Sequence, residues 1–421
     1  MQSGANGDFS CSRALYSCKF IAQNYSMPFA RIPRRTTGRL APGLAFGAAF
    51  LLSMLCAASR AQSTPADAIA LQQQGKFAEA EQAWKSVTAR NPNDAAAFAS
   101  LGVVLSRQQK YSDAATAYRK ALKLDPKLRG VQLNLGLAEF KQGHFPAAAN
   151  ALRAALAADP TRDQAQTLLG ISYYGEQKFA EAIRYLQPAV EHDPANVELR
   201  RFLAQSCLAA KKYDCARDQF RQILEQDPDS AQAHILFGEA LDGLGRTQEA
   251  IAEFEQAAKI SSTEPNAHFA LGYLHWKAQQ YEQAKQEFQE ELKLDPNHAQ
   301  ALAYLGDIEW KNNHPEAALP LLERAAGQQS NLRIVQVDLG AIYMQQKDYG
   351  KALPTLERAV KLDPAQPDAH YQLGRLYQAQ GKSAMAEKEL AKARELHQKA
   401  DEEVAAKIKP APPPVTPEET H

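Results

Sequence analysis

The chain has 421 residues, of which 45% are hydrophobic and 8% aromatic, and its 48 basic residues equal its 48 acidic ones in number. Residues 1–61 hold seven Lys or Arg and a single acidic residue, so subtracting them from the totals leaves 41 basic and 47 acidic residues and a net charge of −6. This mildly acidic remainder gives no electrostatic argument for binding nucleic acid.

The N-terminal leader, residues 1–61, has the layout of a secretory signal peptide. A basic stretch without periodicity precedes the apolar run 44–58, and small residues follow around Ala61. The run suits a signal peptide and is short for a membrane span, which needs about 20 residues. We therefore expect an exported protein of the periplasm or cell envelope, cleaved after Ala61, with Met27 as a second candidate for the start.

An uncleaved leader is the alternative, and it would anchor the protein in the inner membrane through residues 40–58. Contact with the membrane would then be limited to this segment. Two other export signals fit less well. Arg34-Arg35 lacks the hydrophobic residues that follow a twin-arginine motif, and Leu55-Cys56 lacks the small residue that precedes a lipoprotein cysteine.

After the leader, one pattern returns at a constant interval, and the copy that begins at Ala95 shows it clearly. In its first half Phe98, Leu101 and Leu105 follow helical spacing, and a second amphipathic segment begins at Tyr111. Pro126 ends that segment, because proline lacks an amide hydrogen and disfavours helix at the residue before it. Each copy therefore predicts two helices joined by a tight turn.

Small residues recur at one position of each helix, where the two backbones must approach each other. The copies begin at residues 61, 95, 129, 163, 197, 231, 265, 299, 333 and 367. The first-helix set is Ala68, Gly102, Gly136, Gly170, Ala204, Gly238, Gly272, Gly306, Gly340 and Gly374, and the second-helix set is Ala80, Ala114, Ala148, Ala182, Ala216, Ala250, Ala284, Ala318, Ala352 and Ala386. One helix pair cannot cover its own apolar surface, whereas stacked copies can.

This order of residues resembles the tetratricopeptide repeat, a helix-turn-helix unit of about 34 residues. The resemblance implies an all-α, right-handed superhelical solenoid of about ten repeats over residues 62–400, in a bacterial, exported member of the family. Residues 401–421 are expected to begin as the end of a charged helix and to continue as a Pro-rich, disordered tail.

No catalytic or metal-binding constellation stands out in the sequence. It has no G-x-G-x-x-G, P-loop, H-E-x-x-H, G-x-S-x-G or C-x-x-C motif. His268 and His275 would need a third ligand to hold a metal, and no stretch outside the repeats is long enough for a catalytic domain. We therefore predict a non-enzymatic protein without cofactor or metal.

Two cysteines follow the leader, Cys207 and Cys215, one on each helix of the fifth copy. They could face each other across the turn, and an exported chain could be oxidised, so a disulfide is one interpretation. Two small, buried thiols are the other.

The resemblance implies that the first helices line the concave face of the array and bind partners there. The residues predicted for this role are Phe140, Tyr174, Arg201, Phe269, Tyr273, Trp276, Trp310 and Met344. Four of them, Phe140, Tyr174, Trp276 and Trp310, occupy the same position in their copies. This aromatic row would serve either as a peptide groove or as packing between neighbouring copies.

These observations predict a non-enzymatic protein-protein interaction scaffold of the bacterial cell envelope, which binds a partner protein or an extended peptide and no nucleic acid. The alternative function is that of a membrane-anchored accessory subunit of an envelope enzyme, or of a secretion or assembly complex. The N-terminal residue of the mature protein would distinguish the two, because only the second requires an uncleaved leader.

Overall fold

The computed structural model describes residues 63–264 and 266–408 of the chain. The predicted signal peptide, the anchor at residues 40–58 and the Pro-rich tail lie outside the described residues. None of the helices in the described part of the chain combines the length and the apolarity that crossing a bilayer requires.

The fold prediction is confirmed, because the described residues form ten consecutive helix pairs and no strand. The first helices are α2 (Pro65–Gln73), α4 (Ala95–Arg107), α6 (Val131–Lys141), α8 (Asp163–Gly175), α10 (Val197–Ala209), α12 (Ala231–Gly243), α14 (Ala267–Lys277), α16 (Ala299–Lys311), α18 (Arg333–Gln345) and α20 (Pro367–Ala379). The second helices are α3 (Phe77–Arg90), α5 (Tyr111–Leu124), α7 (Phe145–Ala158), α9 (Phe179–His192), α11 (Tyr213–Gln226), α13 (Thr247–Ile260), α15 (Tyr281–Leu294), α17 (Pro315–Gln328), α19 (Tyr349–Leu362) and α21 (Ser383–Ile408).

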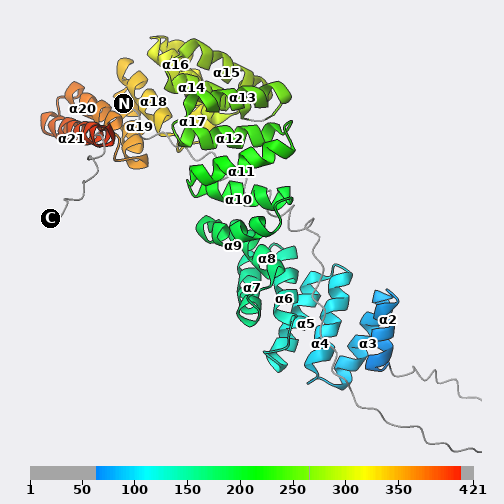
Figure 1. Cartoon of the computed structure of the whole chain (residues 1–421). Helices are drawn as coiled ribbons and strands as arrows, with labels where there is room; N and C mark the ends of the chain where they lie inside the picture. Colours follow the sequence, from blue (N-terminus) through cyan, green and yellow to red (C-terminus); the bar gives the residue numbers. More distant parts are fainter. Residues whose placement is uncertain (1–62, 265, 409–421) are drawn as a thin grey trace, which may run out of the picture. The chain divides into compact units, whose positions relative to one another are not determined.

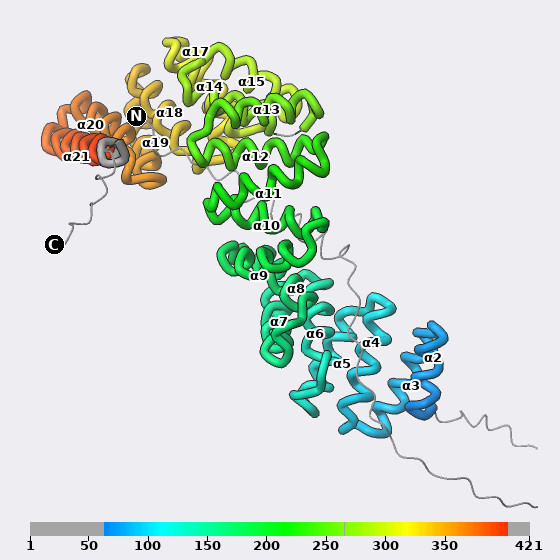
Figure 2. The backbone as a smooth tube through the Cα atoms, in the orientation of Figure 1, coloured from blue at the N-terminus to red at the C-terminus, as the bar shows by residue number. Residues whose placement is uncertain are grey.

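The helices belong to two compact units, which we call the N-terminal unit (described residues 63–225) and the C-terminal unit (residues 226–408). Within each unit the helices lie side by side in chain order (Figure 1). The backbone tube shows the same alternation of first and second helices, joined by short turns (Figure 2).

The turn inside each repeat depends on a residue with positive φ. This position recurs once in every repeat, as Gly75, Gln109, Gly143, Gln177, Lys211, Gly245, Gln279, Asn313, Lys347 and Gly381. In the second repeat the N–H of Gln109 donates to the carbonyl of Ser106, and the N–H of Lys110 donates to the carbonyl of Leu105. These two bonds form a Schellman motif, which ends the first helix and starts the reversal.

Two first helices begin two residues later than the period predicts. Gly130, before α6, has a φ of 79°, and Asn266, before α14, has a φ of 67°. A left-handed residue cannot continue a right-handed helix, so both helices start at the residue that follows.

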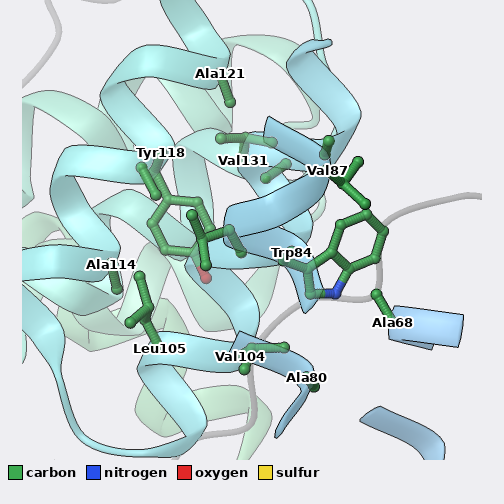
Figure 3. Packing of buried hydrophobic residues seen from close by; sticks show 14 of the residues in the cluster. Ala68, Ala80, Trp84, Val87, Val104, Leu105, Ala114, Tyr118, Ala121 and Val131 are labelled. Atoms are coloured by element: carbon green, nitrogen blue, oxygen red, sulfur yellow. The ribbon is translucent and has the colours of Figure 1, made fainter. Parts of the chain in front are cut away.

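The core of each repeat lies where its two helices cross. A Cβ added to Gly102 would lie 2.5 Å from the ring of Tyr118, and one added to Gly272 would lie 2.7 Å from the ring of Phe288. In the second repeat Tyr118 and Ala114 are fully buried (Figure 3). Glycine is therefore needed opposite a large side chain on the second helix, as the small-residue pattern predicted.

Candidate partner-binding surface

The first helices of consecutive repeats contact one another directly in both units. In the C-terminal unit α14 contacts α16, α16 contacts α18, and α18 contacts α20. Among the described residues, no second helix makes comparable contact with the next second helix. Within each unit, the first helices that contact one another, α4 to α10 and α14 to α20, therefore form a face of their own, which we call the first-helix face.

Side chains on the first-helix face meet diagonally across neighbouring helices. The indole Nε1 of Trp276 donates to Oδ2 of Asp307 at 2.6 Å, and the rings of Tyr273 and Tyr304 lie 5.4 Å apart. In the N-terminal unit Tyr174 donates to Gln205 at 2.9 Å with the same separation in sequence. This separation of 31 residues is one repeat less about one helical turn, so each pair joins neighbouring first helices at positions one turn apart. We call such a series, with members 31 residues apart, a diagonal row.

Four of the eight predicted partner-binding residues are buried: Phe140, Tyr174, Phe269 and Tyr273 are at most 9% exposed. The ring of Phe140 packs on that of Phe145, and the ring of Tyr174 packs on that of Phe202 in the next repeat. These side chains correspond to the packing alternative, and we do not propose that they contact a partner directly.

The other four predicted residues, Arg201, Trp276, Trp310 and Met344, are half-buried and reach the surface. Arg201 makes an ion pair with Glu198 at 3.1 Å. Trp276, Trp310 and Met344 occupy the same position in three consecutive repeats, on α14, α16 and α18. These three helices present a partly exposed apolar strip, which is the type of surface that partner anchors bury.

Charged residues that the sequence analysis did not single out lie beside this strip. The ammonium group of Lys311 lies 2.7 Å from Asp307 and 4.6 Å from the centre of the Trp276 ring. One repeat earlier, Lys277 lies 2.8 Å from Asp242 and 5.6 Å from the Tyr273 ring. Trp276 and Asp307 belong to one diagonal row, so the spacing of that row is the signal that could have identified this pair.

The aromatic side chains beneath the strip remain neutral. Burial raises the pKa of Tyr273 to about 12, and burial also raises the pKa of Tyr304. Their hydroxyl groups therefore stay protonated near neutral pH.

A recurring polar link that the sequence analysis did not predict ties the turns to the helices. The side chains that make it are Arg200, His234, His268 and His370, at one position of four first helices, and each bonds the residue 19 positions later: Gln219, Glu253, Glu287 and Glu389 respectively. Three of them also bond the carbonyl of the proline six residues earlier. In these three repeats the link joins both helices to the turn before them, and in the repeat of His268 it joins the two helices.

The histidines considered for a metal site are occupied by other contacts. The hydrogen bond that His268 donates to the Glu287 carboxylate raises the pKa of His268, with burial opposing it, and Nδ1 of His275 lies 2.8 Å from Oε1 of Gln280. The described residues contain no group of three or more His, Cys, Asp or Glu side chains that could hold a metal ion.

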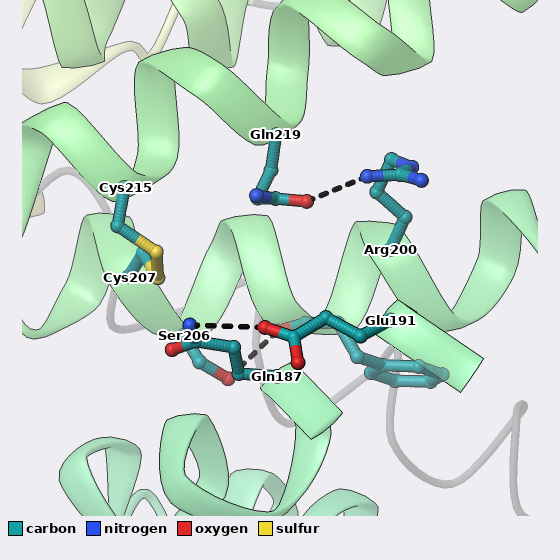
Figure 4. Close-up of a disulfide and its surroundings, with 8 residues drawn as sticks. Gln187, Glu191, Arg200, Ser206, Cys207, Cys215 and Gln219 are labelled. Carbon is teal, nitrogen blue, oxygen red and sulfur yellow. Dashed lines mark hydrogen bonds between the residues drawn. A yellow bond between two sulfur atoms is a disulfide. The ribbon is translucent and has the colours of Figure 1, made fainter. Parts of the chain in front are cut away.

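A disulfide bond joins Cys207 of α10 to Cys215 of α11, with their Cα atoms 5.8 Å apart (Figure 4). The bond lies at the turn end of the hairpin. Farther along the same two helices, Arg200 donates to Gln219 at 2.8 Å. The disulfide bond and the Arg200–Gln219 hydrogen bond therefore connect α10 to α11 at two separate points.

Comparison with protein families gives one result along most of the chain. Models described as "Tetratricopeptide repeat" match residues 66–128, 105–170, 173–238, 269–332 and 367–397. A model described as "TPR repeat" matches residues 243–279 and 340–381. No curated protein matches the sequence.

Solved structures of similar repeats include YrrB, described as a TPR protein with an unusual peptide-binding site. It is 23% identical, with 45% of this chain and 97% of YrrB covered and a TM-score of 0.36. The Cut9–Hcn1 structure is 18% identical, and the match covers 72% of this chain and 59% of that structure's chain, with a TM-score of 0.46. The C-terminal part of a TPR repeat-containing protein from Cytophaga hutchinsonii is 19% identical, and the match covers 56% of this chain and 98% of that one, with a TM-score of 0.45.

Proposed function

The chain belongs to the tetratricopeptide repeat family, and we propose that it is a non-enzymatic scaffold of the bacterial cell envelope that binds a partner protein or an extended peptide on its first-helix face. The observation that carries the proposal is the strip formed by Trp276, Trp310 and Met344 in the C-terminal unit. Half-buried aromatic side chains on a rigid support bind a partner at a small cost in conformational entropy.

The direct test is the double substitution Trp276→Ala with Trp310→Ala in the full chain. We expect capture of partners from envelope extract to fall by about tenfold or more, since large aromatic anchors dominate binding energy. The matched control is Ile260→Ala with Leu294→Ala, which truncates two exposed apolar residues near the ends of second helices. Unchanged capture by the Trp variant, with its helical content retained, would contradict the proposal.

The envelope location is supported by the basic and apolar pattern of residues 1–61. Sequencing the N-terminus of the protein isolated from cells tests it. A start after Ala61 favours an exported scaffold, whereas an intact segment 40–58 favours the membrane-anchored accessory subunit. A cytoplasmic protein with an intact leader would contradict both.

A further inference from the structure

A buried carboxyl group lies beside the Trp strip and is not used by any contact described above. Asp338 of α18 is 7% exposed. Within residues 63–264 and 266–408, its Oδ2 atom has no hydrogen-bond partner. Burying a polar atom without a partner is unfavourable, so a native chain keeps few such atoms unless a ligand completes the bond.

Asp338 continues the diagonal row that begins with Trp276 and Asp307, and its neighbours carry unequal charge. Lys311 pairs with Asp307 at 2.7 Å, and Arg333 pairs with Asp368. Both cations are therefore engaged by other carboxylates. If Asp338 is ionised, three carboxylates face two cations, and one negative charge has no counterpart.

The surroundings of Asp338 favour its neutral form. Burial, together with the nearby Asp307 and Asp368 carboxylates, raises its pKa well above the ordinary value, and Lys311 and Arg333 only partly oppose this. A bound cation would displace the proton and leave an ion pair in its place.

A second unused acceptor lies on the next first helix. Gln372 of α20 occupies the position of Asp338 in the following repeat, and its buried Oε1 atom also has no partner among the described residues. Two acceptors on adjacent helices call for a cation with several donors. A guanidinium group has five N–H donors in one plane, whereas an ammonium group is a compact point charge.

A metal ion is a weaker candidate for this charge. Asp307, Asp338 and Asp368 do not form a metal-binding group, since none occurs among the described residues. An apolar surface also adjoins the site, because the spacing of the diagonal rows places Trp310 opposite Ala341, one helical turn from Asp338. The alkyl part of an arginine side chain can cover such a surface while its head is paired.

We infer that the first-helix face of α16, α18 and α20 binds an arginine side chain of an extended partner segment, with the guanidinium at Asp338 and the alkyl stem against Trp310. The inference rests on the proposed function and specifies the chemistry of the partner. It assigns Asp338 the role of selecting a basic residue, while the Trp strip provides the apolar contact.

The test uses the full chain and two short fluorescent peptides of Ser, Gly and Leu. One peptide carries a central Arg, and its twin carries the neutral isostere citrulline. We expect the Arg peptide to bind about tenfold or more tightly than its twin in fluorescence anisotropy titrations, as hydrogen bonds to charged groups contribute about 1.5 to 3 kcal/mol. Asp338→Asn should remove this preference, and Glu357→Gln, on the exposed side of α19 in the same repeat, should keep it.

Equal binding of the two peptides to the native chain would overturn the inference and leave the scaffold function standing. This comparison does not depend on whether Asp338→Asn folds. Binding of neither peptide would overturn the inference, while the capture experiment with the Trp variant decides the scaffold function separately. Self-association abolished by Asp338→Asn would make a second copy the occupant and would also overturn it.

Discussion

The same diagonal row has opposite chemistry in the two units. In the N-terminal unit it consists of Phe140, Ile171 and Phe202, all at most 2% exposed. In the C-terminal unit the corresponding residues are Trp276, Asp307 and Asp338, which combine a half-buried indole with two carboxyl groups. One backbone arrangement therefore supports either an apolar seam between repeats or a row that holds buried carboxyl groups beside a half-buried indole.

The comparison separates residues that stabilise the array from residues that are available to a ligand. An apolar row gains free energy by removing side chains from water, about 25 cal/mol per Å². A row with an unpaired carboxyl group loses part of that gain. The C-terminal unit thus gives up stability at the place where the N-terminal unit accumulates it.

The largest expected effect comes from opening the apolar row with Phe202→Ala. We expect a loss of about 4 kcal/mol, because the substitution leaves a cavity beneath Tyr174. Urea unfolding measures the total loss of stability, and amide hydrogen exchange should show that the backbone amides of α8 and α10 lose protection from exchange. Phe202→Leu should cost about 1 kcal/mol. A loss below about 1 kcal/mol for Phe202→Ala would show that the row is not a core element.

A second comparison concerns two buried carboxyl groups with opposite pKa shifts. Burial raises the pKa of Glu81 in the N-terminal unit, but hydrogen bonds from Lys110, Lys85 and Gln108 outweigh it and lower the pKa to about 2. Glu81 therefore stabilises the fold above its ordinary pKa of 4.5, and this contribution disappears as the pH falls toward about 2. We expect Glu81 to contribute about 2 to 3 kcal/mol to the free energy of unfolding, which denaturant unfolding across this pH range would measure.

The pH dependence of Asp338 has the opposite sign. Its raised pKa means that the folded state holds the proton more tightly, so stability falls as the pH rises above the ordinary value of 3.8. Glu81→Gln should remove the acid-side loss, and Asp338→Asn should remove the fall toward neutral pH. If the stability of both variants depended on pH as that of the native chain does, Glu81 and Asp338 would not be the groups responsible.

A smaller effect is expected from the disulfide in the N-terminal unit. Its cysteines are eight residues apart, so the bond restricts a short loop, and Cys207→Ala with Cys215→Ala should cost about 2 kcal/mol. Thermal unfolding with and without reductant gives an independent measure. No response to reductant, with both thiols free by mass spectrometry, would show that the bond does not form in the native protein.

The smallest expected effect, in the stabilising direction, tests the polar row itself. Asp338→Leu replaces an unpaired carboxyl group with an apolar side chain of similar size, and we expect a gain of about 1 kcal/mol. The same variant should lose its preference for the Arg peptide. Destabilisation by more than about 1 kcal/mol would mean that Asp338 has a structural partner and is not reserved for a ligand.

The sequence predicted the repeated helices because their determinants are local. Gly102 and Ala114 recur at fixed positions, and a proline such as Pro126 ends a helix wherever it falls. The late start of α6 was not predicted, since it depends on the φ of Gly130. Positive φ at Gln109 and Lys211 was also unexpected, because neither residue type favours it.

The site was predicted only in outline. Helical spacing placed Tyr174 and Trp276 at the same position of the first helix, but it could not show that Tyr174 is covered by the next repeat. That depends on the diagonal contact between helices, which brings Gln205 to Tyr174 and Asp307 to Trp276. Asp338 was missed because a single acidic residue in a helix usually faces solvent.

The measurement that tests the account most directly is photo-crosslinking in intact cells. The photoreactive residue p-benzoylphenylalanine replaces Trp310 on the first-helix face in one strain and Glu357 on the second helix α19 in another. We predict that a partner protein becomes attached at position 310 and not at position 357. Attachment at position 357 with none at position 310 would contradict it.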